Sequence, residues 1–296
     1  MKLEAADSVF SDGIEGGAYL IDSFEIATFL PKLARDQNKY DAGYLLAVAG
    51  SAGMEGAAIL ATSSALRCGC GIVRLFHPPE IEGHLHRAAI ELICASINAD
   101  NMESFTSELA RADALLIGPG MGRSQDTALL VKRVLEQTTV PMVIDADALY
   151  HLPVGTILKN SVLTPHRGEM KRLLQKADAS TFLQQCNDFA QDRQCTLVLK
   201  GYPTYIFHPG QKVIVMPHGD PGMATAGTGD LLTGAIGALL ASGIEAHKAA
   251  IIGVYIHARA GEFAAAKYGS RGMIASDMLK LLPRALLKLE FPFITP

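Results

Sequence analysis

The residues with the clearest chemical potential form segment 222–230, which reads GMATAGTGD and is followed by an apolar helical pattern. Small residues let a backbone approach a ligand closely. A helix that begins near Thr228 would aim free N–H groups and its positive dipole end at an anion. Asp230 would lie in the first turn, where its carboxylate should be stabilised as the anion and serve as a general base. The alternative interpretation is that Asp230 only caps the helix.

Glycine or polar residues follow each of five short apolar runs. The runs span residues 45–49, 114–117, 142–144, 162–163 and 196–199, and they are continuous, as in parallel strands buried on both faces. The segments after them are Gly50-Ser51-Ala52-Gly53, Gly118-Pro119-Gly120-Met121-Gly122, Asp145-Ala146-Asp147, Thr164-Pro165-His166 and Lys200-Gly201. Because ligands bind beyond the carboxyl ends of such strands, we expect one cleft lined by these segments.

Asp145 and Asp147 are a candidate carboxylate pair within that cleft. Residues two apart face the same side within a strand, but they can diverge where the chain leaves it. One of the two is a candidate for binding Mg²⁺ or water, and packing or capping is the alternative role. The metal ligands therefore stay unassigned.

These runs must be positioned by an α/β fold with a central, mostly parallel sheet and helices on both faces. A sixth run at 72–76 adds another strand, and residues 205–207 and 213–216 are predicted to form a hairpin. The helices are expected at 55–67, 126–136, 181–193, 230–241, 247–267 and 276–282, and Pro283 is expected to stop the last one. The Ala/Gly-rich helices around 234–241 and 247–266 are candidates for close packing between subunits.

The chain is expected to have an N-terminal extension, residues 1–38, and a single domain, residues 39–296, because no linker divides the latter. Within the extension, Asp22 and Ser23 predict the cap of a short helix that runs through Leu30 and ends before Pro31.

Composition excludes several classes of function. The 26 basic and 30 acidic residues are interspersed and give a net charge of −4, so we expect no nucleic-acid or membrane partner. The N-terminus has no signal-peptide pattern, no apolar run is long enough for a membrane span, and five cysteines without a C-x-x-C pair favour a reducing cytoplasm. The sequence also has no P-loop, dinucleotide fingerprint or nucleophile elbow.

Together the motifs resemble the ADP/ATP-dependent NAD(P)H-hydrate dehydratases, a branch of the ribokinase-like superfamily, from about Lys39 to Leu282. The more general motif is Gly-Thr-Gly-Asp, which several vitamin kinases share. The more specific ones are Asp-Ala-Asp-Ala-Leu from residue 145 and Thr-Pro-His-x-Gly-Glu from residue 164. The resemblance implies dehydration of the S epimer of hydrated NADH or NADPH, with ADP or ATP as co-substrate, Mg²⁺ as cofactor and a homotetramer.

The resemblance also implies roles for individual residues. Asp230 would be the catalytic carboxylate. The substrate contacts would be Ala57, Gly120, Gly122, His166 and Asp230. The adenine nucleotide contacts would be Lys200, Gly201, Tyr202, Pro203, Thr204, Thr228 and Gly229.

The sequence departs from the family pattern in several places, and one is the stretch from Lys39 to Gly43, which replaces a more Gly-rich version. Ala226 replaces a usual glycine, and its methyl group is tolerated only if its φ is negative. Asp220 replaces a common asparagine, and its charge would weaken nucleotide binding if it lay near phosphates. The 38 leading residues are too short for a companion epimerase domain. A ribokinase-like kinase of vitamin precursors, and a binding protein without activity, are the alternative functions.

Overall fold

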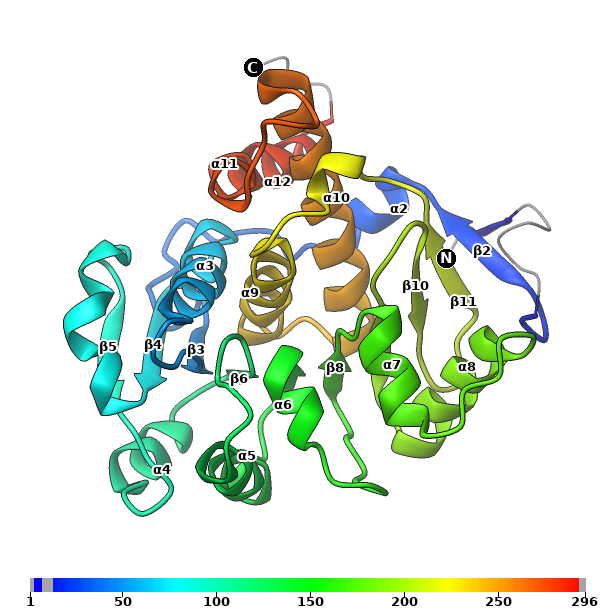
Figure 1. Ribbon diagram of the computed structural model, residues 1–296. Coiled ribbons are helices and arrows are strands. Elements are labelled where there is room, and N and C mark those ends of the chain that lie inside the picture. The colour runs from blue at the N-terminus through cyan, green and yellow to red at the C-terminus, as the bar shows by residue number, and fades with distance from the viewer. Residues whose placement is uncertain (1–2, 7–12, 293–296) are drawn as a thin grey trace.

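The apolar runs form the strands of one mixed sheet in the computed structural model, which describes residues 3–6 and 13–292 (Figure 1). Across these residues the sheet has eleven strands in the order β1-β2-β11-β10-β9-β8-β7-β6-β3-β4-β5. Their bounds are β1 Leu3–Ala5, β2 Ala18–Ile21, β3 Tyr44–Val48, β4 Ile72–His77, β5 Ile93–Ser96, β6 Ala114–Ile117, β7 Met142–Ile144, β8 Ser161–Leu163, β9 Thr196–Leu199, β10 Thr204–Phe207 and β11 Val213–Met216.

The strands from β9 through β8, β7, β6, β3 and β4 to β5 all pair in parallel. Strands β10 and β11 form the expected antiparallel hairpin, and β10 also pairs antiparallel with β9. The five runs singled out in the sequence are therefore adjacent parallel strands, and their carboxyl ends lie along one edge. The predicted fold class is confirmed.

Helices cover both faces of the sheet because successive strand residues point to opposite sides. Their bounds are α2 Ser23–Ala27, α3 Glu55–Arg67, η1 Pro79–Arg87, α4 Glu103–Leu109, α5 Gln125–Gln137, α6 Ala146–His151, α7 Arg167–Leu174, α8 Phe182–Arg193, η2 Pro221–Met223, α9 Thr228–Ala241, α10 Ala246–Tyr268, α11 Ala275–Leu279 and α12 Leu282–Glu290. Helices α3, α9, α10 and α12 pack on one face, and α4 to α8 contribute to the core on the other.

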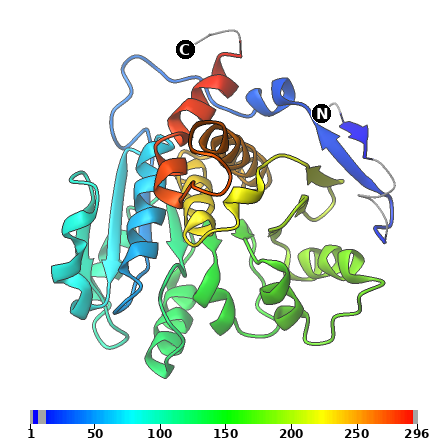
Figure 2. The ribbon, with the colours of Figure 1, turned by 45° about the horizontal axis from the view of Figure 1, so that its top comes forward.

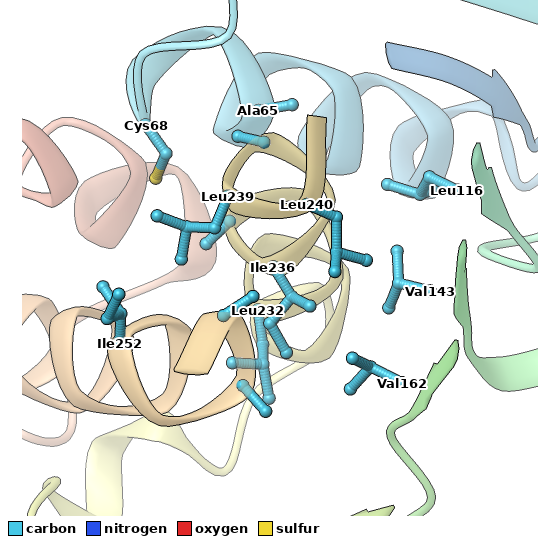
Figure 3. Close-up of a cluster of buried hydrophobic side chains, with 14 of the residues drawn as sticks. Ala65, Cys68, Leu116, Val143, Val162, Leu232, Ile236, Leu239, Leu240 and Ile252 are labelled. Carbon is cyan, nitrogen blue, oxygen red and sulfur yellow. The ribbon is translucent and has the colours of Figure 1, made fainter. Parts of the chain in front are cut away.

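Helix α9 lies in the centre of its face, where Leu232 and Ile236 point toward Leu116, Val143 and Val162 of the sheet (Figure 3). The hydroxyl of Ser64 in α3 donates to the backbone oxygen of Leu231 at 2.6 Å. This packing fixes the helix that carries Asp230 against the middle of the sheet.

Helices α9 and α10 pack against each other within the chain. All of α9 apart from Gly229 and Asp230 is buried, and α10 packs along it (Figure 2). The suggestion that an Ala/Gly-rich face contacts another subunit is wrong for α9, because the chain itself covers it. For α10 the suggestion stays a prediction.

The segment before residue 39 contains structure that the sequence did not predict. Strand β2 pairs in parallel with β11, and β1 pairs with β2 (Figures 1 and 2). Asp22 caps α2 as expected by accepting from the backbone N–H of Glu25 at 2.8 Å, but the helix ends at Ala27 and only turns continue to Leu30. The expected extension therefore adds two strands to the same sheet.

Pro283 has a different role from the one expected. The helix before it, α11, ends at Leu279, and Pro283 lies in the first turn of a further helix, α12. A proline is tolerated there because the first backbone N–H groups of a helix have no intrahelical acceptor. Within the described residues, no helix is long and apolar enough to cross a membrane.

Candidate active site

Hydrogen bonds and a glycine cap fix the first turn of α9 in place. Gly227 caps the helix with a left-handed φ of +91°, a conformation that favours glycine. The hydroxyl of Thr228 donates to the carbonyl oxygens of Met223 at 2.9 Å and Thr225 at 3.1 Å. The helix thus begins at Thr228, as the sequence predicted.

A buried histidine supports the same turn from α10. His257 Nε2 lies 2.8 Å from the carbonyl oxygen of Thr228, an acceptor, so this nitrogen carries a proton and donates. Burial lowers the pKa of His257 to about 4, so the ring is neutral at physiological pH. His257 therefore fixes the first turn of α9 without adding charge to it.

Asp230 lies in this first turn, and its environment corrects one expectation. Burial, with the charges of Asp145 and Asp147, raises the pKa of Asp230 to about 7, although the charge of Lys200 acts in the opposite direction. The sequence argument, that the helix start would stabilise the anion, is wrong in direction because burial and two nearby carboxylates outweigh it. A carboxylate that titrates near neutrality is nevertheless well matched to general base catalysis.

Lys200 and Asp145 form a buried ion pair beside Asp230. Lys200 Nζ donates to Asp145 Oδ1 at 2.8 Å, and the hydroxyl of Thr233 donates to Asp145 Oδ2 at 2.7 Å. The side chain of Asp145 is 1% exposed and that of Lys200 20%. Burial lowers the pKa of Lys200, but the negative charges of Asp145, Glu169 and Asp230 raise it by more. The pKa of Lys200 therefore lies above its ordinary value. A fixed ammonium therefore stands next to the candidate base.

Lys200 also lies beside the first turn of α9. A Cβ built at Gly229 would lie 3.4 Å from Lys200 Nζ, so the absence of a side chain at Gly229 leaves space next to the ammonium. Backbone N–H groups of a helix start, a lysine cation and a carboxylate thus converge on one place. Such an arrangement can hold a phosphate and remove a proton from a group that attacks it.

Asp147 points away from Asp145 and organises the neighbouring glycine loop. Its Oδ2 accepts from the backbone N–H of Gly122 at 2.9 Å, and its Oδ1 accepts from Arg123 Nε at 3.1 Å. The two carboxylates therefore diverge where the chain leaves β7. Gly118, at the start of the loop, has a φ of +128°, and a Cβ there would lie only 1.8 Å from the backbone oxygen of Asp145.

The expected substrate contacts after β3 and β6 come together. The hydroxyl of Ser51 donates to the backbone oxygen of Gly120 at 2.8 Å. A Cβ built at Gly120 would lie 2.9 Å from the Cβ of Ala57, and one at Gly122 would lie 3.6 Å from Ser51 Oγ. Ala57, Gly120 and Gly122 therefore lie next to one another at the carboxyl edge.

His166 lies in the next loop along the edge and caps α7. Its Nδ1 accepts from the backbone N–H groups of Gly168 at 3.0 Å and Glu169 at 3.2 Å, while Glu169 accepts from the backbone N–H of His166 at 2.8 Å. The backbone of His166 is bridged to that of Lys200. The imidazole is 60% exposed, and its Nε2 lies 3.5 Å from Glu169 Oε1.

Comparisons with known proteins identify the family to which this site belongs. The family model described as NAD(P)H-hydrate dehydratase matches residues 45–284. The chain belongs to the NAD(P)H-hydrate dehydratase family. A Xanthomonas campestris protein named ADP-dependent (S)-NAD(P)H-hydrate dehydratase is 31% identical over 269 residues, which are 88% of this chain and 93% of that protein.

Longer relatives and solved structures agree with this family. A bifunctional NAD(P)H-hydrate repair enzyme from Moorella thermoacetica is 39% identical over 277 residues, and the chain spans about half of that relative, 52%. A Bacillus subtilis ADP/ATP-dependent NAD(P)H-hydrate dehydratase, co-crystallised with ATP and Mg²⁺, has a TM-score of 0.78 at 26% identity, covering 92% of this chain and 98% of that one. A ribokinase-like protein from Enterococcus faecalis reaches 0.83 at 26% identity, with 91% and 95% covered.

The family's expected nucleotide segment, Lys200 to Thr204, divides into two environments. Lys200 is turned into the site, whereas Tyr202 is 72% exposed. The hydroxyl of Thr204 donates to the backbone oxygen of Gly201 at 3.0 Å and closes the turn. Gly201 and Pro203 complete this turn between β9 and β10. Its assignment to nucleotide binding stays a prediction.

Two of the departures from the family pattern are accommodated locally. The φ of Ala226 is not positive, so its methyl group is tolerated. Asp220 caps η2, because its Oδ1 accepts from the backbone N–H of Gly222 at 2.7 Å and its Oδ2 from the hydroxyl of Ser270 at 3.1 Å. These hydrogen bonds engage both carboxylate oxygens.

Two residues of the site had no role assigned from the sequence. Thr233 donates a hydrogen bond to Asp145. The sequence could have indicated this residue, because it lies three residues after Asp230 and therefore on the same side of the helix. His257 had no role from the sequence, and its support of Thr228 became visible when α10 was placed beside α9. Both residues hold groups that the sequence did predict, Asp145 and the first turn of α9.

Proposed function

We propose that this protein catalyses the ADP- or ATP-dependent dehydration of the S epimer of hydrated NADH or NADPH and restores the reduced dinucleotide. The observation that carries the proposal is the convergence of Asp230, Lys200 and the open first turn of α9 on one place. Membership of the NAD(P)H-hydrate dehydratase family supports the same reaction.

The chemistry follows from the poor leaving ability of hydroxide. Asp230 accepts the proton of the C6 hydroxyl while that oxygen attacks the terminal phosphorus of the adenine nucleotide. The bond between the terminal phosphorus and its bridging oxygen breaks, which releases AMP from ADP or ADP from ATP. The ring nitrogen lone pair then expels phosphate from C6, and loss of a proton from C5 to the departing phosphate regenerates the double bond.

The cations of the site stabilise the charge that moves in this reaction. The ammonium of Lys200, held by Asp145, lies where it can neutralise the transferring phosphoryl group, and the N–H groups at Thr228 and Gly229 add further donors. Ala57, Gly120, Gly122 and His166 hold the hydrated dinucleotide in this proposal. The turn from Gly201 to Thr204 holds the nucleotide that Lys200 contacts.

We also propose that Mg²⁺ enters with the nucleotide phosphates. No cluster of three or more His, Cys, Asp or Glu side chains suited to a metal exists among the described residues. Magnesium usually keeps several waters and takes one or two carboxylates plus phosphate oxygens. Asp145 lies beside the α9 start, but its two oxygens already accept from Lys200 and Thr233, so the protein ligands of the ion stay unassigned. The ion would neutralise phosphate charge there. We further propose that the protein forms a homotetramer and acts in the cytoplasm.

The test is turnover of hydrated NADH with ADP or ATP and Mg²⁺. The proposal predicts that absorbance of the reduced nicotinamide returns and that one inorganic phosphate is released for each dinucleotide restored. Accumulation of a phosphorylated dinucleotide, without phosphate release, would instead identify a kinase. Nucleotide binding without any turnover of the hydrate would identify a binding protein and refute the proposal.

A further inference from the structure

A second hollow lies on the same edge of the sheet, away from Lys200. It is a cavity of about 390 Å³ at the carboxyl ends of β3, β4, β5 and β6. Lys200 follows β9, which lies at the other end of the parallel part of the sheet. Strands β8 and β7, the latter leading to Asp145, lie between β9 and the strands of the cavity. The site around Asp230 therefore has free space on the side opposite to the expected nucleotide segment.

The glycine loop joins this cavity to the site. At one end of the loop Gly118 touches the backbone of Asp145, and at the other end Gly122 and Met121 line the cavity together with Ser51. Gly122 is also held by Asp147, two residues after Asp145. A ligand whose reacting end lies at Asp230 can follow the loop from Gly118 to Gly122 and reach the cavity.

We propose that this cavity binds the adenosine half of the hydrated dinucleotide, so that the two adenine-containing ligands approach Asp230 from opposite sides. This inference rests on the proposed function, because it requires a dinucleotide substrate. The volume falls within the range of about 300 to 1,000 Å³ that is typical of small-molecule sites. The loop residues Gly120 and Gly122, proposed above as substrate contacts, would then lie under the middle of the molecule.

The lining suits a purine nucleoside. Pro79, Ile97, Met121 and Leu130 supply apolar surface for a base. Asn98 also lines the cavity; its Oδ1 accepts from two backbone N–H groups, which leaves its NH₂ group to donate. A mostly apolar wall with a few placed polar groups is the usual composition of such a site.

The charges of the lining favour a ribose without a 2′-phosphate. Glu80 and Asp126 line the cavity, and neither has an ion-pair partner within the described part of the chain. Carboxylates accept hydrogen bonds from ribose hydroxyls but repel a phosphate. Arg123 also lines the cavity, but Asp147 binds its Nε and its guanidinium lies 4.7 Å from the ring centre of Tyr150. Hydrated NADH is therefore the better fit.

The inference is tested by filling the cavity and shortening the substrate. Ala52 lines the cavity and is exposed, so Ala52→Trp should occupy it without disturbing the core, while exposed Ala177→Trp is the matched control outside it. We expect Ala52→Trp to lower kcat/KM for hydrated NADH about tenfold more than for hydrated reduced nicotinamide mononucleotide, which has no adenosine half. An equal loss on both substrates, or a raised KM for ADP or ATP, would overturn the inference.

A binding measurement separates this inference from the proposed reaction. With the nucleotide site saturated by a non-hydrolysable ATP analogue, calorimetry should show ADP-ribose binding to the parent and at least about tenfold weaker binding to Ala52→Trp. Equal affinities would overturn the cavity assignment even if the enzyme turns over hydrated NADH. If no hydrate is turned over but this difference is found, the reaction fails and the adenosine site stands.

The charge argument has its own control. The double variant Glu80→Gln, Asp126→Asn should raise kcat/KM for hydrated NADPH relative to hydrated NADH about fivefold, the effect of about 1 kcal/mol between exposed charges. The double variant Glu82→Gln, Glu91→Gln removes the same charge from exposed residues outside the cavity and should leave that ratio unchanged. An unchanged ratio in the first variant would refute the placement of the ribose.

Discussion

Replacing Asp230 by asparagine should abolish most of the activity and stabilise the fold at neutral pH. The carboxylate is the base, and a positioned base contributes about 10²- to 10⁴-fold in rate, so Asp230→Asn should lose a factor in that range. Asparagine has nearly the same shape but carries no charge. The stability gain follows because burial, Asp145 and Asp147 oppose the charged form of Asp230.

The size and direction of that gain follow from proton linkage. The pKa of Asp230 is about 7 in the folded chain against an ordinary value of 3.8, and the difference corresponds to about 4 kcal/mol. Because the residue is partly exposed, screening reduces this figure, and we expect about 2 kcal/mol. A raised pKa means that the parent loses stability as pH rises from about 4 to about 7, and the variant does not.

Urea unfolding followed by circular dichroism measures this difference, which suits a chain without tryptophan. Asp230→Asn and the parent should be equally stable near pH 4, and the variant should be more stable at pH 8. Asp192→Asn, on the exposed surface of α8, is the control and should show no such divergence. If Asp230→Asn is less stable than the parent at pH 8, or retains activity within tenfold, the electrostatic account of the site is refuted.

Three further predictions concern two groups beside Asp230 and a buried histidine at the start of α10. Lys200→Met should raise the KM for ADP or ATP and move the rise of kcat/KM with pH to higher pH, because the ammonium lowers the pKa of Asp230; an unchanged KM and pH profile would remove Lys200 from the site. Thr233→Val should cost about 1 to 3 kcal/mol in urea unfolding by leaving an oxygen of buried Asp145 without its donor, whereas Thr233→Ser should retain most of the stability; equal losses would argue against this hydrogen bond. Burial lowers the pKa of His247 to about 4, so the unfolded chain binds a proton at this residue at higher pH than the folded chain does. The free energy of unfolding should therefore fall as pH drops from about 6.5 toward 4. His247→Phe, which can still stack on His208, should show a smaller fall in Tm over this range, and a fall identical to that of the parent would contradict the prediction.

The parallel centre of the fold was predictable because its strands are buried on both faces. Runs such as Ala114–Ile117 and Thr196–Leu199 are continuous in apolar or small residues, and the residues that follow them mark the ligand-binding edge. The strands at the two ends of the sheet were missed although their residues are mostly apolar. Ile93–Ser96 is largely exposed and Ala18–Ile21 is half-buried, and the sequence alone does not show that such short runs pair with the sheet.

The candidate site was predictable in its parts but not in its electrostatics. The position of Asp230 in the first turn of α9 followed from the glycines before it, but its raised pKa depends on Asp145 and Asp147, which are more than 80 positions away in sequence. The divergence of those two carboxylates was left open by the sequence, because a pattern does not show where a strand ends. The capping of η2 by Asp220 likewise depends on Ser270, which only the fold brings near.

The central claim is that the hydroxyl of the substrate leaves as phosphate after Asp230 has helped it to attack the nucleotide. Hydrated NADH carrying a heavy oxygen isotope in its C6 hydroxyl tests this directly. Mass spectrometry of the inorganic phosphate formed with ADP or ATP should find the label in one phosphate oxygen. Label recovered in water, with unlabelled phosphate, would show that the hydroxyl leaves without being phosphorylated and would contradict the account.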